Sequence, residues 1–408
     1  MTEAVIVSTA RSPIGRANKG SLTKVRPDDL AATIVAAALA KVPGLDPTTI
    51  DDLMLGCAQP AGTQGYNIAR VVSDLAGMGN VPGVTVNRYC SSSLQTIRMA
   101  AHAIKAGEGD AFVAAGVETV SQFMLGMSDG LPGTHNPLMA AAEARTAERV
   151  KGGAPVWSPF AGGVADYYLG MGQTAENVAQ LEGVSRQEQD EFAAMSQQRA
   201  GAAQARGFFE REITGIETVD ADGNPVTITQ DDCIRAGTTL EKLSELKPAF
   251  RPDGTVTAGN ACPLNDGAAA VIVMSDTRAR ELGLTPIARI ISSGVSGVNP
   301  EIMGLGPIDA CRQAMARAGM TIDDIDLVEI NEAFAAQVVP SAKHLGISWD
   351  KLNINGGAIA LGHPFGMTGA RIMATLLNAL EDTGKTVGME SMCIGGGQGM
   401  AMIIERLA

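Results

Sequence analysis

Three side chains that can act as nucleophile, acid or base stand at turns that follow strand patterns: Cys90, His363 and Cys393. Cys90 comes after residues 84–87 and opens a helical pattern beside three serines. The free N–H groups and the dipole at the start of a helix favour a thiolate, the nucleophilic form of cysteine. A buried structural cysteine is the alternative, because that is the commonest role of a free cysteine.

His363 stands in a glycine-rich stretch, residues 356–369, whose side chains are too small to bury an imidazole. We therefore expect His363 to face a cavity, where it could act as a base. A structurally satisfied histidine is the alternative. The remaining histidines lie in helical patterns (His102, His344) or in a polar loop (His135), and no chemistry is assigned to them.

Cys393 ends a strand pattern and is followed by Ile-Gly-Gly-Gly-Gln-Gly. The backbone N–H of Gly395 could point at an oxyanion, because glycine leaves the backbone bare. A phosphate-binding loop would lead into a helix, whereas residues 400–404 have a strand pattern, so nucleotide binding is rejected here. Asn331 follows the strand pattern 327–330, and its amide could hold a water or donate to an oxyanion, although Asn also caps helices.

A serine-hydrolase elbow is matched as a string by Gly126-Met-Ser128-Asp-Gly130. In such enzymes a helix follows the serine, but here Leu131-Pro-Gly comes next. The match is interpreted as chance, and a serine hydrolase acting through Ser128 is kept as an alternative from another class.

Short apolar strand patterns alternate with Ala-rich helical patterns, which predicts an α/β protein with largely parallel sheets. The expected strands are residues 4–8, 84–87, 111–115, 270–274, 326–330, 352–355, 390–394 and 400–404. The expected helices are 29–42, 91–106, 307–318 and 368–380, with polar helices at 172–182 and 185–206.

The two ends of the chain have similar patterns: an Asp-containing strand, a second strand, a turn of small residues, a helix and a third strand. This indicates an internal duplication, unless the likeness is only that of any two βαβ units. Function often lies where two such halves meet. Residues 122–264 differ, with a Gly/Pro/Met-rich stretch at 126–163, and they are interpreted as an inserted lobe.

Composition limits the class of protein. The chain has 408 residues, 48 glycines and a net charge of −13, so nucleic acid and anionic membranes are not expected as main partners. No apolar run reaches the roughly 20 residues of a membrane span. Six cysteines without a Cys-x-x-Cys pair predict neither a disulfide framework nor a zinc site. We therefore expect a reduced, cytoplasmic protein without a metal.

The ordered set of motifs resembles the thiolase family over nearly the whole chain. The resemblance is carried by the Cys90 turn, Met171-Gly-Gln-Thr-Ala-Glu-Asn177, Thr257-Ala-Gly-Asn-Ala261, Asn265-Asp-Gly-Ala-Ala-Ala270, Asn331-Glu-Ala-Phe334, Gly362-His-Pro364 and Cys393-Ile-Gly-Gly-Gly397. It implies a five-layered αβαβα fold of two duplicated halves with an inserted loop domain. The implied parts are 1–121 completed by 265–284, the insertion 122–264 for coenzyme A binding, and 285–408.

The resemblance also implies roles for the residues singled out above. Cys90 would be the nucleophile and His363 its base. Cys393 would be the second acid and base. His363 and a water on Asn331 would stabilise an enolate, while the N–H groups of Cys90 and Gly395 would stabilise a tetrahedral oxyanion. No tightly bound cofactor is implied, and the partners are acyl-CoA, CoA and other copies of the chain in a homodimer or homotetramer.

Coenzyme A carries phosphates, so an acidic protein needs a local basic patch to bind it. Residues 235–251 hold four basic against two acidic side chains, and Lys242 and Arg251 among them are interpreted as a solvated charged face. By resemblance, Arg235 and Leu246 lie around the adenine. By resemblance again, the pantetheine channel is lined by Met171, Ala258, Ala261, Leu264 and Phe334.

Some positions depart from the family pattern. Ser93 replaces a usual Gly, Gly170 replaces a His of the biosynthetic branch, and Cys262-Pro263 replaces a small pair. The segment 124–163 is unusually long and rich in Gly and Pro. The sequence Cys90-Ser-Ser at the start of the helical pattern and the residue Gly170 favour a degradative 3-oxoacyl-CoA thiolase. The alternatives are an acetyl-CoA C-acetyltransferase and a thiolase-like scaffold without catalysis.

Overall fold

The computed structural model describes residues 2–125, 129, 131–220 and 222–408. Ser128 therefore lies outside the described residues. The main strands follow one path of hydrogen-bonded neighbours, in the order β10-β11-β12-β9-β1-β8-β5-β3-β4. In the first half of the chain they are β1 (Ala4–Arg11), β3 (Asp52–Gly56), β4 (Gly83–Val86), β5 (Ala111–Thr119) and β8 (Asn265–Ser275). In the second half they are β9 (Ala288–Gly297), β10 (Leu327–Ile330), β11 (Val387–Ile394) and β12 (Gln398–Arg406).

The two halves of this path have the same pairing scheme. From the centre outward, β1, β8, β5 and β3 correspond to β9, β12, β11 and β10. In each series the second strand is antiparallel to both its neighbours, and the third and fourth strands are parallel. The fifth member is β4 in the first half and an isolated parallel bridge at Leu352 in the second. The predicted duplication is therefore confirmed.

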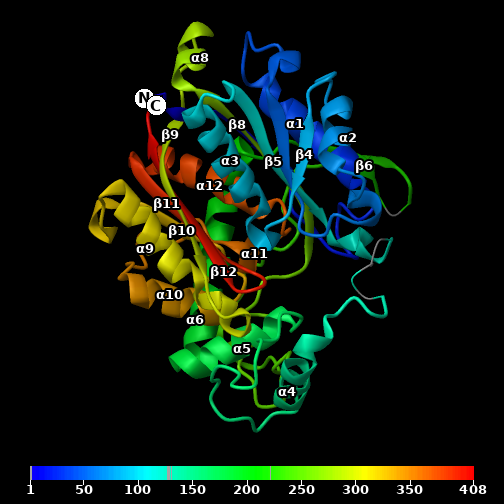
Figure 1. The fold of residues 1–408 in the computed structure, drawn as a ribbon, viewed down its shortest axis with the longest axis vertical. Coiled ribbons are helices and arrows are strands. Elements are labelled where there is room, and N and C mark those ends of the chain that lie inside the picture. The colour runs from blue at the N-terminus through cyan, green and yellow to red at the C-terminus, as the bar shows by residue number, and fades with distance from the viewer. Residues whose placement is uncertain (1, 126–128, 130, 221) are drawn as a thin grey trace.

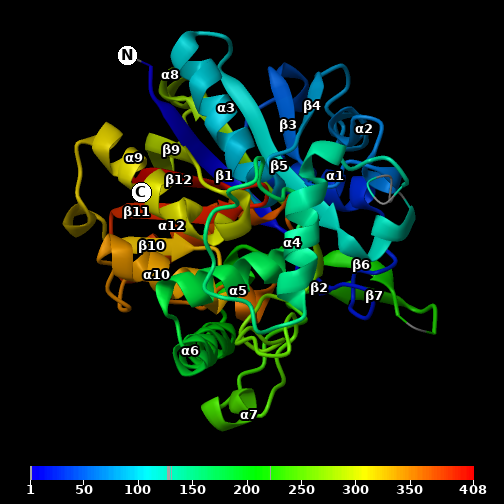
Figure 2. The ribbon, with the colours of Figure 1, turned by 60° about the horizontal axis from the view of Figure 1, so that its bottom comes forward.

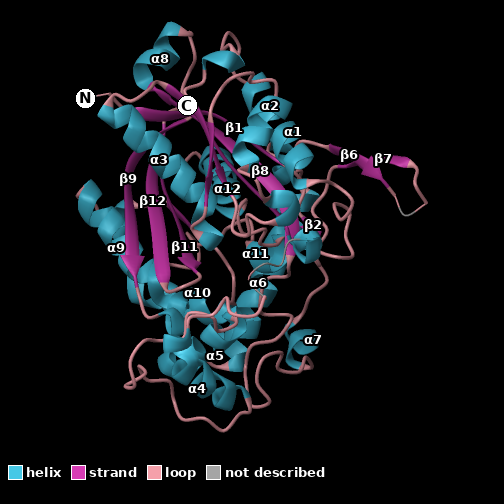
Figure 3. Cartoon of the chain, turned by 45° about the vertical axis from the view of Figure 1, so that its right-hand side comes forward, coloured by secondary structure: helices cyan, strands magenta, loops and turns pink. Residues whose placement is uncertain are grey.

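Helices separate and cover the two half-sheets, giving five layers (Figures 1 and 3). The central helices α3 (Ser92–Ala106) and α12 (Thr368–Thr383) pack on each other and on strands of both halves. The outer layers are formed by α1 (Pro27–Ala40) with α2 (Ile68–Leu75), and by α9 (Gly306–Ala318) with α10 (Ala335–Leu345). Gly107 and Gly384, both left-handed, end the two central helices in the same way.

One predicted strand was wrong, and one long strand was not predicted. Residues 352–355 form a turn, because Asn353 is left-handed (φ 44°) and its amide binds the N–H and the carbonyl of Ile330. Strand β9 was missed because its Ser and Gly residues hide the apolar pattern. Its Gly294 is required by close packing, since a Cβ there would lie 2.1 Å from the carbonyl oxygen of Ala310 in α9.

The segment between β5 and β8 forms a separate lobe beside one end of the half-sheets (Figures 1 and 3). Its helices are α4 (Ala140–Val150), α5 (Met171–Glu182), α6 (Arg186–Ala205) and α7 (Leu240–Ser244). Its hairpin, β6 (Ile216–Val219) and β7 (Pro225–Ile228), projects away from the body (Figure 2). The remaining short elements are β2 (Gly15–Arg16), α8 (Asp276–Glu281) and α11 (Ala358–Leu361). None of the described helices is long and apolar enough to cross a membrane.

Candidate active site

Cys90 lies in a short 3-10 turn that leads directly into α3. The turn is fixed by Ser92, whose hydroxyl accepts the Arg88 N–H (2.9 Å) and donates to the Tyr89 carbonyl (2.7 Å). Tyr89 itself has a positive φ of 44°, which is rare for a bulky side chain. Strained backbone of this kind is often found at functional sites. The Cys90 side chain is buried, with 8% of its surface exposed.

Cys90 is a neutral thiol in the resting protein. Burial raises the pKa of Cys90 to about 11, although the N–H groups of Gly395 and of Cys90 itself donate to the sulfur and lower the pKa. The backbone N–H groups thus favour the thiolate, as expected, but desolvation outweighs them. A separate base must remove the proton before Cys90 can attack.

His363 has the tautomer and the neutral charge that such a base needs. Its Nδ1 lies 2.7 Å from the hydroxyl of Thr368, which donates its own hydrogen to the Pro364 carbonyl. Nδ1 must therefore donate to Thr368, and this leaves Nε2 unprotonated, as the ring nitrogen that can accept a proton. His363 is 1% exposed, so the expectation that its small neighbours could not bury it was wrong. Burial, helped by the charge of Arg371, lowers the pKa of His363 to about 3, so the ring is neutral at pH 7.

Asn331 links His363 to the second thiol. Its side-chain Nδ2 lies 3.3 Å from Nε2 of His363, and its backbone carbonyl accepts from Gln337 Nε2 at 3.5 Å. The thiol of Cys393 in turn donates to Gln337 Oε1 at 3.5 Å. Asn331 Oδ1 is buried and has no hydrogen-bond partner among the described residues. That free acceptor is suited to an ordered water.

Cys393 is also a neutral thiol in the resting protein. Burial raises the pKa of Cys393 well above its ordinary value, and the nearby Cys90 and Cys262 sulfurs raise it further. A neutral thiol of this kind can donate a proton to a strongly basic carbanion or enolate. Among the described residues, no group of three or more His, Cys, Asp or Glu side chains is gathered as a metal site requires.

The loop that carries His363 is anchored by the buried carboxylate of Glu118 at the end of β5. Glu118 accepts from the N–H groups of Gly366 (2.8 Å) and Ala58 (2.9 Å) and from the amide of Gln64 (2.8 Å). A Cβ on Gly116 would lie 2.0 Å from the carbonyl oxygen of Gly366, so β5 and the loop are in direct backbone contact. Glu118 is thus a positioning residue.

Glu118→Gln should therefore lower kcat with little change in KM. The glutamine amide would turn an N–H₂ group toward a backbone N–H, leaving donors unpaired at a cost of ~1–3 kcal/mol of stability. A small displacement of the His363 loop should lower kcat by about tenfold or more, because proton transfer depends steeply on geometry. Steady-state kinetics and a thermal unfolding curve measure both effects.

Glu217→Gln, which changes an exposed carboxylate in β6, is the matched control and should behave as wild type. A Glu118→Gln protein that is less stable but has wild-type kcat would show that Glu118 only supports the fold.

A cavity of about 760 Å³ opens between the lobe and residues 16–19, with Ile359 of α11 also on its wall. Five of the seven residues expected around coenzyme A line it: Arg235, Leu246, Ala258, Ala261 and Leu264. The other two lie nearby. Phe334 pairs through its backbone with Ala261, and Met171 contacts Gly395, where a Cβ would lie 3.7 Å from its sulfur.

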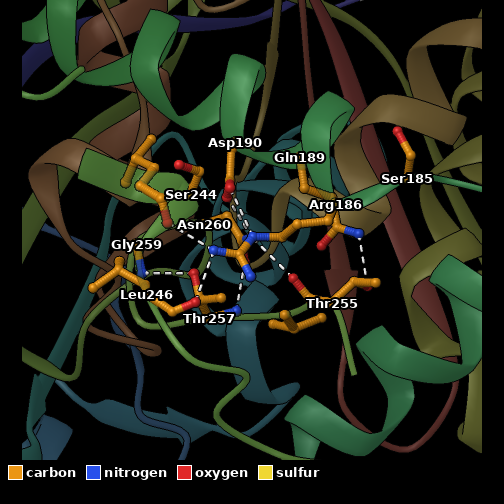
Figure 4. Close-up of polar contacts among 12 residues, drawn as sticks. Ser185, Arg186, Gln189, Asp190, Ser244, Leu246, Thr255, Thr257, Gly259 and Asn260 are labelled. Atoms are coloured by element: carbon orange, nitrogen blue, oxygen red, sulfur yellow. Dashed lines mark hydrogen bonds and ion pairs between the residues drawn. The ribbon is translucent and has the colours of Figure 1, made fainter. Parts of the chain in front are cut away.

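A polar network on α6 fixes two segments of the cavity wall (Figure 4). Arg186 donates to the carbonyls of Leu243 (2.6 Å) and Leu246 (2.9 Å) and pairs with Asp190 (2.7 Å). Asp190 also accepts from Asn260, whose Oδ1 accepts the Thr257 N–H at 2.8 Å. The two segments therefore share one buried carboxylate as their anchor.

The cavity is more basic than the sequence indicated. Arg16, Lys19 and Lys242 line it together with Arg235. Lys242 is exposed, as interpreted from the sequence, and it also lines the cavity. Arg251, which was interpreted in the same way, is not solvated, because it is buried and donates to Gln173 and Asn177. Arg16 and Lys19 were missed because β2 and the turn after it are distant in sequence from residues 235–251.

The departures noted in the sequence have structural explanations. Ser93 is buried and its hydroxyl accepts the Ala370 N–H of α12 (2.9 Å), so it holds the two central helices together. Cys262 lines the cavity, and burial raises the pKa of its thiol. A Cβ on Gly170 would contact nothing within 4 Å, which leaves open space at that position.

The two duplicated halves meet near two thiols, a neutral histidine and a bare glycine N–H. This combination defines a thiolase-type acyltransferase. The chain belongs to the thiolase family: the descriptions "Thiolase, N-terminal domain" and "Thiolase, C-terminal domain" match residues 4–277 and 284–406. It is 47% identical to a 3-ketoacyl-CoA thiolase of Aeromonas hydrophila subsp. hydrophila, and 45% identical to one of Shewanella baltica, with both chains covered completely.

A solved structure gives the same family and fold. The acetyl-CoA acetyltransferase of Bacillus anthracis superposes with a TM-score of 0.85 at 38% sequence identity, covering 100% of this chain and 99% of that one. The predicted family, the five-layered fold and the class of enzyme are therefore confirmed.

Proposed function

We propose that the protein cleaves 3-oxoacyl-CoA with CoA, giving acetyl-CoA and an acyl-CoA shortened by two carbons. The observation that carries this proposal is the contact between the Cys90 turn and the end of β11, where a Cβ on Gly395 would lie 3.5 Å from the Tyr89 ring. This contact supports a shared reaction centre for Cys90, the Gly395 N–H and the strand that bears Cys393. The full-length relatives named 3-ketoacyl-CoA thiolase support the same reaction.

The first half-reaction begins when His363 Nε2 takes the proton of Cys90. The thiolate attacks C3 of the substrate, and the N–H groups of Cys90 and Gly395 stabilise the oxyanion. The bond between C2 and C3 breaks, and its electron pair forms the enolate of acetyl-CoA. Cys393 then protonates C2, while His363 and a water held by Asn331 stabilise the enolate oxygen.

The second half-reaction releases the acyl group from Cys90. The CoA thiol, with an ordinary pKa of about 8.5, ionises to solvent and attacks the thioester as a thiolate. The released Cys90 sulfur recovers its proton from His363, and Cys393 recovers its proton from solvent. Two separate half-reactions of this kind predict ping-pong kinetics.

Residues 122–264 form, in this proposal, the inserted domain that binds coenzyme A. Arg235 would face its phosphates, and Leu246 would contact the adenine. Met171, Ala258, Ala261, Leu264 and Phe334 would line the pantetheine channel toward Cys90. No tightly bound cofactor takes part in the steps above.

The alternative is an acetyl-CoA C-acetyltransferase that condenses two acetyl-CoA molecules. It is favoured by the likeness to the Bacillus anthracis enzyme, whereas Gly170 and the higher identity to 3-ketoacyl-CoA thiolases favour the degradative reaction.

Medium-chain 3-oxoacyl-CoAs should have a kcat/KM at least equal to that of acetoacetyl-CoA, as the full-length likeness to 3-ketoacyl-CoA thiolases suggests. Thiolysis assays with C4 to C12 substrates under the same conditions measure this. A strong preference for the C4 substrate would favour the condensing enzyme instead.

We also propose a cytoplasmic homodimer or homotetramer. Thiol chemistry requires a reducing compartment. Strand β4 ends the strand order, and an edge strand of this kind can pair with its copy in a second chain. Light scattering on the purified protein distinguishes this assembly from a monomer.

A further inference from the structure

A second cavity, of about 350 Å³, lies between the two halves of the fold and is lined by basic side chains. Arg98, His102 and Lys105 come from α3, and Arg317 comes from the end of α9. The remaining lining residues are Ala101, Ile290, Ile291, Ser292, Ser293 and Met402, and none of them is acidic. A volume of this size is at the lower end of the range for small-molecule sites, roughly 300–1,000 Å³.

The cations of this cavity are not neutralised by the protein. Within the part of the chain that the structure describes, Arg98, Lys105 and Arg317 form no ion pair. Each makes one hydrogen bond to a neutral acceptor, namely Ser293 Oγ, the Ile290 carbonyl and the Ser293 carbonyl. Most of their N–H groups therefore remain available to a ligand.

The duplicated fold provides an internal comparison for this cavity. In the first half the hydroxyl of Ser8 in β1 donates to the Ala38 carbonyl of α1 at 2.7 Å. In the second half Ser292 of β9 donates to the Ala314 carbonyl of α9 at the same distance. These matched contacts identify α1 and α9 as equivalent helices packed on equivalent strands.

The cations next to these strands also correspond. Lys41 follows α1 and donates to the carbonyl of Thr9, just as Arg317 near the end of α9 donates to the carbonyl of Ser293. In both halves a basic side chain from the outer helix therefore reaches the same position on the central strand.

In the first half a carboxylate lies near the basic side chain of the outer helix, whereas no carboxylate lines the cavity in the second half. The buried carboxylate of Glu212 pairs with Arg11 of β1 (3.0 Å) and accepts from Thr375 of α12 (3.1 Å). Its charge also acts on Lys41. The second half has more cations and no carboxylate in the equivalent cavity.

We propose that this cavity binds a small phosphate-bearing anion with at least two negative charges. The guanidinium groups of Arg98 and Arg317 hold its oxygens, since arginine matches phosphate geometry with paired N–H donors. Lys105 and His102 add donors from the adjacent turns of α3. The ligand takes the place that the Glu212 carboxylate occupies in the first half.

The site is separate from the proposed catalytic centre. It shares no lining residue with the larger cavity. From Cys90 to His102 the chain advances along α3 by roughly 18 Å at the usual helical rise. Variants in this cavity can therefore be tested without touching the residues that handle acyl-CoA.

Isothermal titration of the full-length protein with inorganic pyrophosphate at low ionic strength tests the proposal. Wild type should bind it, and the Arg98→Gln/Arg317→Gln double variant should bind about 100-fold more weakly, at roughly tenfold for each charged hydrogen-bond donor. The control double variant Arg278→Gln/Arg312→Gln removes the same charge from two exposed ion pairs and should bind as wild type. Unfolding midpoints of all proteins verify that they are folded.

Three results would overturn the proposal. The first is a wild-type protein that does not bind pyrophosphate. The second is an equal loss of affinity in both double variants, which would reflect net charge alone. The third is binding that is lost in Arg235→Gln but kept in Arg98→Gln/Arg317→Gln, which would place the anion in the larger cavity.

Discussion

Cys90→Ala is expected to abolish thiolysis, with kcat lower by roughly 10⁴-fold or more, because no other group can form the acyl-enzyme. The mass of the intact protein after incubation with a medium-chain 3-oxoacyl-CoA in the absence of CoA gives the direct test. Wild type should gain one acyl group on Cys90, and Cys90→Ala should gain none. Peptide mapping locates the added mass.

Cys311→Ala is the matched control for this experiment. Cys311 is also a buried thiol with a raised pKa, but it lies in the core of α9 against the second half-sheet. The control should keep both the adduct and turnover. An adduct on any residue other than Cys90 would refute the mechanism. Activity lost in Ser128→Ala but kept in Cys90→Ala would instead identify a serine hydrolase.

The same thiol provides a second readout through its pKa. Because the pKa of Cys90 is raised to about 11, its thiolate fraction should increase with pH throughout the range from 8 to 10. Alkylation of the free protein by iodoacetamide should therefore accelerate with pH and show no plateau in that range. A plateau near pH 7 would mean that the resting protein holds Cys90 as a thiolate.

The motif residues could be predicted from the sequence because each stands beside a turn of small residues. The strand patterns of β1, β5, β8 and β12 were equally clear, since these strands are buried on both faces. Their contacts across the fold could not be predicted. The Gly395 N–H reaches Cys90 only because the β11–β12 turn of one half meets the start of α3 in the other.

The supporting residues were missed for a similar reason. Thr368 fixes the tautomer of His363, Gln337 links Cys393 to Asn331, and Glu118 anchors the His363 loop. Thr368 and Gln337 follow recognisable motifs, but in the sequence they cannot be distinguished from ordinary helix residues. Glu118 lies at the end of a strand that is far in sequence from the loop it holds. Long-range polar contacts of this kind leave no local pattern.

Cys393→Ala is expected to separate two activities that Cys90→Ala loses together. Cleavage between C2 and C3 should fall by about 10²–10⁴-fold, the usual contribution of a positioned general acid. Exchange of labelled CoA into a preformed straight-chain acyl-CoA should continue, because that reaction needs only Cys90, His363 and the oxyanion donors. Both rates are measured on the same preparation, one by loss of 3-oxoacyl-CoA and the other by incorporation of label.

His363→Ala is the control that shows whether this separation is specific. It removes the base for Cys90 and should therefore slow cleavage and exchange alike. Burial is the main cause that raises the pKa of Cys393, so its proton is retained until a strong base such as the enolate forms nearby. Equal loss of cleavage and exchange in Cys393→Ala would contradict the division of labour between the two thiols. It would assign Cys393 a part in activating Cys90 instead.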